Sequence, residues 1–160
     1  VPKHLRAKPV AGAPAVLPTS QEAPQVWRYA LNTPPENWSA PDFDDSAWKE
    51  GPGGFGTAGT PGAVVRTEWK TQDIWLRRAF EVGDLSAKDL AWRIHFDEDP
   101  EVYLNGVPAA RFPGYSTSYS LYRLDPPARA VAPRSASRRD ALRELVQAAA
   151  SHRRPLTLTA

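Results

Sequence analysis

Two short runs of acidic residues are the first places in this chain where residue types could do chemistry. They are Asp42, Asp44 and Asp45, and then Asp97, Glu98 and Asp99. Paired carboxylates can act as acid and base on a glycosidic bond, and carboxylate oxygens are also the ligands that calcium prefers. The spacing selects neither chemistry. We expect the first run to cap a short turn before Trp48 and the second to cap a strand end before Pro100, with residues 97–99 as candidate ligands of a structural calcium ion.

Other catalytic or cofactor patterns are weak. Residues 51–56 spell G-x-G-x-x-G, but a dinucleotide site needs a strand before this run and a helix after it, and more loop-forming residues follow. We expect a long glycine-rich surface loop. The histidines, His4, His95 and His152, are far apart, and the G-x-S-x-G nucleophile pattern is missing. The sequence therefore predicts no catalytic residue and no cofactor, and a chain that is not an enzyme by itself.

Aromatic residues offer a better candidate for binding. An aromatic face stacks on the C–H side of a sugar ring, so surplus exposed Trp or Tyr on a β-sandwich indicates carbohydrate binding, whereas buried Trp is ordinary core. We expect Trp48, Trp75 and Trp92 in the core. The candidates for a ligand-binding surface lie in expected loops or near strand ends, and they are Trp38, Trp69, Tyr115 and Tyr119.

Charge and hydropathy exclude two classes of partner. The pI near 9.1 would suit nucleic acid, but the basic excess lies in the last part of the chain: residues 1–122 hold 12 Lys and Arg against 15 Asp and Glu, whereas residues 123–160 hold 8 Arg against 3 acidic residues. No run approaches the roughly 18 to 20 apolar residues that span a bilayer. We expect neither a nucleic acid nor a membrane as partner.

Composition and periodicity predict one all-β domain. The 160 residues include 17 Pro and 10 Gly, which suits short strands and many turns. All 16 aromatic residues lie between Trp27 and Tyr122, so residues 25–124 should form the domain, after a proline-rich linker over residues 1–24. Residues 74–82 and 90–96 alternate with period two, residues 25–30 and 119–124 are further strand candidates, and Asn105-Gly106 predicts a tight hairpin.

Three motifs in this window resemble a known family. They are Asp42-Phe-Asp-Asp-Ser-Ala-Trp48, Asp73-Ile-Trp-Leu-Arg-Arg-Ala-Phe80, and His95 through Val107 with its Val-Tyr-Leu-Asn-Gly hairpin, followed by Gly114-Tyr115. In order and spacing they resemble the galactose-binding-like jelly-roll β-sandwich. The closest form is the sugar-binding domain of glycoside hydrolase family 2 and of related multidomain bacterial hydrolases.

The resemblance implies a non-catalytic carbohydrate-binding or accessory domain within a larger glycoside hydrolase, with carbohydrate and a neighbouring catalytic domain as partners. The alternative is a purely structural β-sandwich that braces that catalytic domain and has no sugar site. An extracellular or periplasmic location is favoured by the resemblance only. Since the chain begins at Val1 and has no methionine, we also expect a piece of a longer protein.

The tail, residues 125–160, departs from the family pattern. It is rich in Ala and Arg and has neither aromatic residues nor lysine. Apolar residues at helical spacing predict an amphipathic helix over residues 138–150. We expect residues from about Ala128 onward to be the product of a shifted reading frame, so that the sandwich lacks its last strands. The competing interpretation is a genuine helix that docks through Leu142, Leu145 and Val146.

Overall fold

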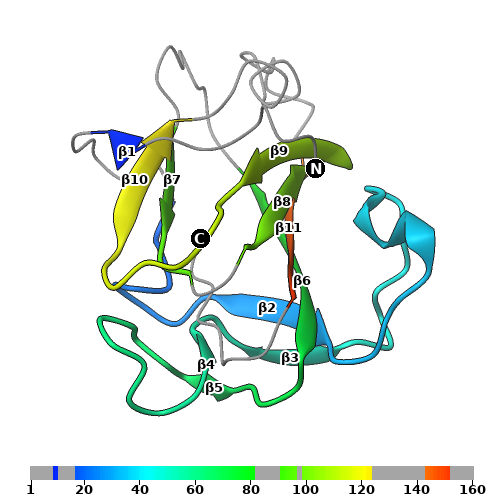
Figure 1. The fold of residues 1–160 in the computed structure, drawn as a ribbon. Helices are drawn as coiled ribbons and strands as arrows, with labels where there is room; N and C mark the ends of the chain where they lie inside the picture. Colours follow the sequence, from blue (N-terminus) through cyan, green and yellow to red (C-terminus); the bar gives the residue numbers. More distant parts are fainter. Residues whose placement is uncertain (1–8, 11–16, 82–90, 97–98, 124–142, 152–160) are drawn as a thin grey trace.

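The described part of the chain is a β-sandwich with a single short helical turn. The computed structural model describes residues 9–10, 17–81, 91–96, 99–123 and 143–151 (Figure 1). Within this part, the strands and the one 3-10 helix are β1 (Pro9–Val10), β2 (Val26–Ala30), η2 (Glu36–Ser39), β3 (Lys49–Pro52), β4 (Phe55–Gly56), β5 (Thr67–Glu68), β6 (Asp73–Glu81), β7 (Ala91–Ile94), β8 (Glu101–Leu104), β9 (Val107–Arg111), β10 (Ser120–Arg123) and β11 (Arg143–Ser151). The expected all-β class is confirmed. Within the described segments, no helix has the length and apolar character that a bilayer crossing requires.

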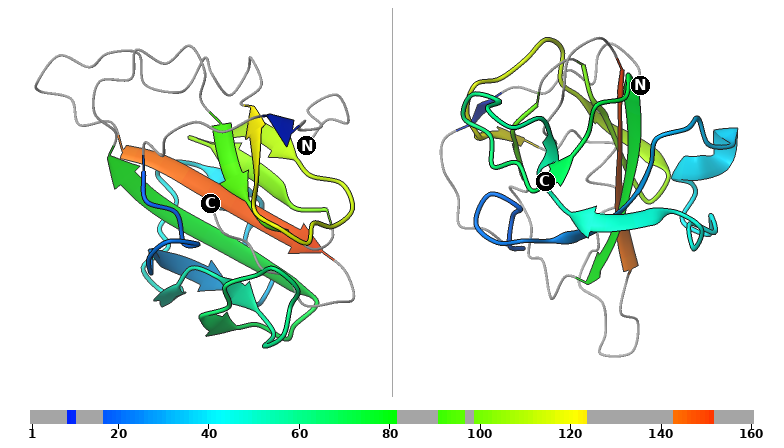
Figure 2. Two further views of the ribbon diagram at one scale, coloured as in Figure 1. Left: turned by 90° about the vertical axis from the view of Figure 1, so that its left-hand side faces the viewer. Right: turned by 90° about the horizontal axis from the view of Figure 1, so that it is seen from below.

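The strands form two main antiparallel sheets and one small pair. The larger sheet has six strands in the order β3-β2-β6-β11-β8-β9, and the second has three in the order β1-β10-β7. Strands β4 and β5 form a short parallel pair. Figure 2 shows β11 running beside β6 along its length, in agreement with the register from Arg143 opposite Glu81 to Ser151 opposite Asp73.

The core lies between these sheets and follows from the alternation of side chains along each strand. On the larger sheet, one face carries buried apolar side chains, here called the inner face. Tyr122, Trp92 and Ile94 of the smaller sheet belong to the same cluster. The buried hydrophobic residues are Trp27, Phe55, Trp69, Ile74, Leu76, Trp92, Ile94, Phe96, Val102, Leu104, Ala109, Ala110, Phe112 and Tyr122. Of the tryptophans expected in the core, Trp92 is buried, whereas Trp48 and Trp75 are half-buried.

Local signals in the sequence place several elements correctly. Asn105 and Gly106 have φ angles of 49° and 78°, the positive values that a tight hairpin turn requires, and they join β8 to β9. The expected strands over residues 25–30, 74–82 and 119–124 correspond to β2, β6 and β10, with Val82 and Leu124 outside the described part of the chain. The expected strand over residues 90–96 corresponds to β7, and of its residues Leu90 lies outside the described part of the chain.

The expected surface loop over residues 51–56 is wrong. This run forms the end of β3 and all of β4, and Gly51, Gly53, Gly54 and Phe55 are buried. A Cβ on Gly51 would lie 2.8 Å from the Thr67 hydroxyl oxygen, and a Cβ on Gly54 would overlap the Val64 carbonyl oxygen. Glycine is therefore needed at Gly51 for close packing against the Thr67 side chain and at Gly54 for close packing against the backbone of Val64.

The two ends of the chain also differ from expectation. Residues 9–10, within the expected linker, pair with β10, and Thr19 and Ser20 are buried. The expected helix over residues 138–150 is wrong for residues 143–150, which belong to β11, while residues 138–142 lie outside the described part of the chain. β11 bonds to β6 on one side and to β8 on the other, so pairing across the sheet overrides the helical spacing of the apolar residues.

Candidate functional site

The four aromatic candidates do not form one binding face. Trp69 is 1% exposed and belongs to the core, where its indole N–H donates to the Thr71 hydroxyl over 2.7 Å. The expectation that Trp69 lies on a ligand-binding surface is therefore corrected. The reason is local: β5 pairs with β4, and the Trp69 amide donates to the Gly56 carbonyl, which holds the residue against buried Phe55 and its neighbours.

Trp38 lies in η2 and is half-buried. Its ring meets the ring of Tyr103 edge-on, with 5.4 Å between the centroids. Because Tyr103 belongs to β8, Trp38 connects η2 to the larger sheet.

Tyr115 and Tyr119 lie elsewhere, in the segment between β9 and β10. Tyr115 is 72% exposed, more than Val26, the other exposed large hydrophobic residue in the described part of the chain. Tyr119 is half-buried: its hydroxyl accepts a hydrogen bond from the Val64 amide over 3.2 Å, and its ring lies 5.4 Å from that of His95. Figure 1 shows this segment on the opposite side of the molecule from η2, which is the cyan helical turn.

The acidic runs serve structural roles where they are described. Asp97 and Glu98 lie outside the described residues. Asp99 is exposed, and its carboxylate accepts the Gly114 amide over 2.7 Å. In the first run, the Asp44 carboxylate accepts the Ser46 amide over 3.0 Å, as expected for a capped turn. No group of three metal-ligating side chains occurs within the segments that the structure describes.

The most developed polar site is centred on Arg77 in β6. Its side chain is 1% exposed, although it points away from the inner face. The guanidinium donates to the carboxylate of Asp45 over 2.7 Å and to the carbonyl oxygens of Trp38, Ala40 and Phe43. A planar fork of five N–H donors suits such a set of acceptors, which compensate the cost of burying the charge.

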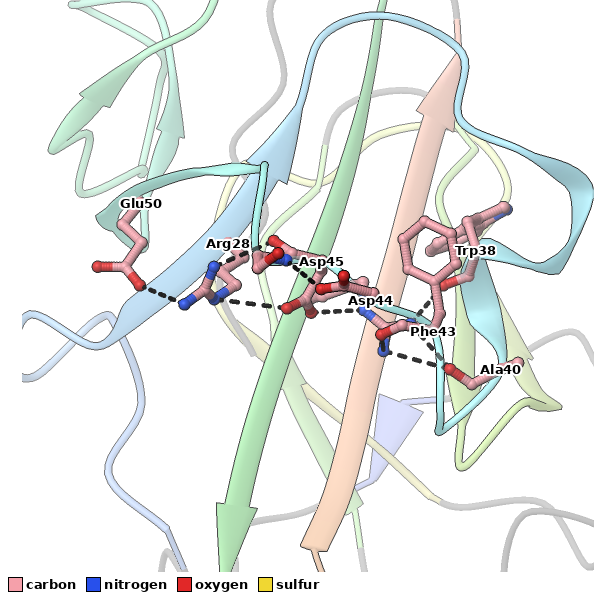
Figure 3. Close-up of polar contacts among 9 residues, drawn as sticks. Arg28, Trp38, Ala40, Phe43, Asp44, Asp45 and Glu50 are labelled. Atoms are coloured by element: carbon pink, nitrogen blue, oxygen red, sulfur yellow. Dashed lines mark hydrogen bonds and ion pairs between the residues drawn. The ribbon is translucent and has the colours of Figure 1, made fainter.

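Residues 36–48, here called the strap, supply all of these acceptors. The strap therefore covers the outer face of the larger sheet at β6, as Figure 3 shows. At its far end, Trp38 packs on Tyr103 of β8, and a Cβ on Gly106 would lie 3.3 Å from the Ser39 carbonyl oxygen. Since β11 lies between β6 and β8, the strap crosses the sheet over β11.

The network continues past Asp45 to the edge of the sheet. Arg28 in β2 lies opposite Arg77 in the register, and its guanidinium bonds to both Asp45 and Glu50 of β3 (Figure 3). A line of charge-assisted contacts thus runs from β3 across β2 to β6. Asp45 accepts from two guanidinium groups and is its central acceptor.

Two groups at the strap have shifted pKa values. Burial raises the pKa of the Tyr103 phenol to about 12. The nearby Glu101 carboxylate contributes to this rise in pKa, and it accepts a hydrogen bond from the phenol O–H over 3.2 Å. The side-chain and backbone hydrogen bonds from Ser46 lower the pKa of the exposed Asp44 carboxyl.

The sequence interpretation missed the role of Arg77 because period two assigned it to the polar face of a half-buried strand. The predicted alternation of side chains along β6 was correct, since Arg77 does face away from the core. The available signal was that Arg77 and Asp45, a pair of opposite charges, sit in two motifs of the same resemblance.

Comparisons with known proteins are sparse. No family model matches the chain, and no curated protein matches it in sequence. Among solved structures, 86% of the chain is similar to part of a beta-glycosidase from Bacteroides vulgatus, with a TM-score of 0.46 and 13% sequence identity. The chain spans 19% of the length of that protein.

Proposed function

We propose that the chain is a non-catalytic accessory domain of a larger carbohydrate-active hydrolase, built on a galactose-binding-like jelly roll. One observation supports this most directly: the three motifs that carry the sequence resemblance meet at the strap. Asp45 comes from the first motif, Arg77 from the second, and Tyr103 with Gly106 from the third. Segments far apart in the sequence thus contact one another in one structural unit. This is expected if the three motifs are typical of the fold.

The environment of the carboxylates supports a role without catalysis. Asp45 is held by Arg77 and Arg28, Asp99 by the Gly114 amide, and Glu101 by Tyr103. A glycosidase needs two carboxyl groups facing each other across the substrate, at about 5 Å or about 6.5–9.5 Å. Each of these carboxylates has a structural partner instead.

Tyr115 is our candidate for contact with carbohydrate. It is the one aromatic candidate with a largely exposed ring, and a phenol ring offers both a stacking face and a hydroxyl. Such a shallow contact gives few desolvated anchors, so we expect weak binding. Trp38 already packs on Tyr103, and the Tyr119 hydroxyl already accepts a hydrogen bond from the Val64 amide. We therefore expect both to contribute less to carbohydrate binding than Tyr115.

Affinity electrophoresis of the full chain through gels containing soluble glycans tests the proposal. We expect weak retardation by at least one glycan, reduced in Tyr115→Ala with little change in melting temperature. Trp69→Ala is the matched control for a core tryptophan, and it should lower the melting temperature instead. Retardation by no glycan, with the fold intact, would favour the bracing domain that has no sugar site.

The same preparation tests the absence of catalysis. Incubation with a panel of chromogenic aryl glycosides should release no chromophore. Hydrolysis that disappears in Asp99→Asn or Glu101→Gln would overturn the proposal and identify an enzyme.

A further inference from the structure

β11 is the last strand of the described chain, and it lies in the interior of the larger sheet. The five other strands of that sheet all lie between residues 26 and 111, and β11 is inserted between β6 and β8. Without β11 the sheet would be two separate parts, β3-β2-β6 and β8-β9. The two edges that face each other, β6 and β8, form what is here called the slot.

Contacts that do not involve β11 hold the slot together. On the outer face, the strap is bound to β6 through Arg77 and to β8 through the Trp38–Tyr103 ring contact. The strap therefore links the two edges of the slot without β11.

The strand that fills the slot is held by main-chain pairing on both sides. Residues 143–151 pair with β6 over the whole length of both strands, and Val146 to Ala149 also pair with β8. Main-chain hydrogen bonds depend on register and not on which molecule supplies the strand. Residues 124–142 separate β11 from β10 in the sequence, a longer separation than the two to five residues of a hairpin loop.

We propose that the slot between β6 and β8 is a strand-exchange interface, in which residues 143–151 of a second copy of this chain replace the chain's own β11. The exchanged strand makes the same pairs as the original, so the exchange costs mainly the entropy of association. The share of exchanged dimer therefore rises with protein concentration during refolding. An open edge at either β6 or β8 would otherwise attract other strands.

Disulfide trapping tests this directly, because the chain has no cysteine of its own. Ala79, exposed on β6, lies opposite Leu145 of β11 in the register, within reach of a disulfide between paired strands. We would make Ala79→Cys in one full-length chain and Leu145→Cys in another of different tag size. The two would be unfolded together, refolded at high concentration and oxidised.

We expect a covalent heterodimer at several times the yield obtained when Ala149→Cys replaces Leu145→Cys. Ala149 lies opposite Trp75 and so is out of register with Ala79. The double variant Ala79→Cys/Leu145→Cys, refolded dilute, should form the bond within one chain. The unmodified chain should give a dimer fraction in light scattering that rises with refolding concentration.

Three results would overturn the proposal. One is heterodimer yield no greater than with Ala149→Cys, while the double variant forms its internal bond, which would show a strand that stays in its own chain. Another is failure of the internal bond, which would contradict the register itself. The last is an unmodified chain that refolds only to monomer at every concentration.

Discussion

Asp45 and Arg77 form the charged pair on which the outer face depends. The Arg77 guanidinium is almost fully buried, and its acceptors come from four positions in the strap. Removing one partner of a buried pair leaves the other charge without compensation, which costs more than the pair itself contributes. The strap should therefore loosen from β6 when either partner is changed.

We expect Asp45→Asn to lower the free energy of unfolding by about 3 kcal/mol, because Arg77 would remain buried with carbonyl acceptors alone. Denaturant unfolding measures this. Glu50→Gln is the matched control, since the Glu50 side chain is 57% exposed in its ion pair with Arg28, and it should cost under about 1 kcal/mol. Equal effects of the two changes would show that the buried Asp45–Arg77 pair contributes no more to stability than the exposed Arg28–Glu50 pair.

Tyr103 predicts a specific response to high pH. Its pKa in the folded state is raised to about 12, above the value near 10 of an unfolded chain. The protonated phenol is therefore favoured by folding, so its contribution is fully present below pH 10 and is lost as the pH rises toward 12. We expect Tyr103→Phe to flatten the decline in unfolding free energy over that interval. An unchanged slope would contradict the prediction.

The short elements β3, β4 and β5 pack through glycine. Gly54 has a φ of 104°, and the Arg66 and Thr67 amides both donate to its carbonyl oxygen. The Val64 carbonyl occupies the space that a side chain would need. At this position a side chain faces both backbone strain and overlap with a backbone atom, so the pairing of β4 with β5 depends on glycine.

Gly54→Ala and Gly59→Ala separate these two costs. Gly59 also has a positive φ, 86°, but a Cβ there meets nothing within 4 Å. We expect Gly59→Ala to cost about 1 kcal/mol from backbone strain alone. Gly54→Ala should cost about 2 kcal/mol more because of the overlap. Thermal melts of both variants measure the difference, and equal melting temperatures would show that the packing around Gly54 relaxes.

At the scale of the whole molecule, the larger sheet is completed by the end of the described chain. β11 pairs with β6 and β8, both distant in sequence, and contacts of this kind make folding slow. Prolines in the larger sheet lie on its edge strands, Pro52 in β3 and Pro108 in β9, where a missing N–H is tolerated. In a central strand, a proline would leave a neighbouring strand without one of its main-chain hydrogen bonds.

Ala148→Pro should therefore be severely destabilising. Ala148 pairs with Leu76 on one side and with Val102 on the other. Proline removes a main-chain donor from the middle of the sheet and should cost about 3 kcal/mol or more. Ala148→Ser keeps the donor and serves as the control. If both variants melt at the temperature of the unmodified chain, β11 is not a central strand in solution.

The sequence alone determined the features that depend on neighbouring residues. Period two and the richness in Pro and Gly predicted an all-β chain, because alternation places apolar side chains on one face of a strand. Asn105-Gly106 predicted the β8–β9 hairpin because its turn needs two positive φ angles. Aromatic residues located the core between Trp27 and Tyr122, and 7 of the 16 are buried in it.

Only the tertiary structure decided which surfaces are covered. Arg77 follows the parity of its strand, but the strap buries it, and no local pattern reports that a distant segment lies above a strand. Trp69 is in the core because β5 pairs with β4, and residues 143–151 are extended because two open strand edges flank them. In each case the environment comes from residues far away in sequence, and pairing or burial there outweighs local preference.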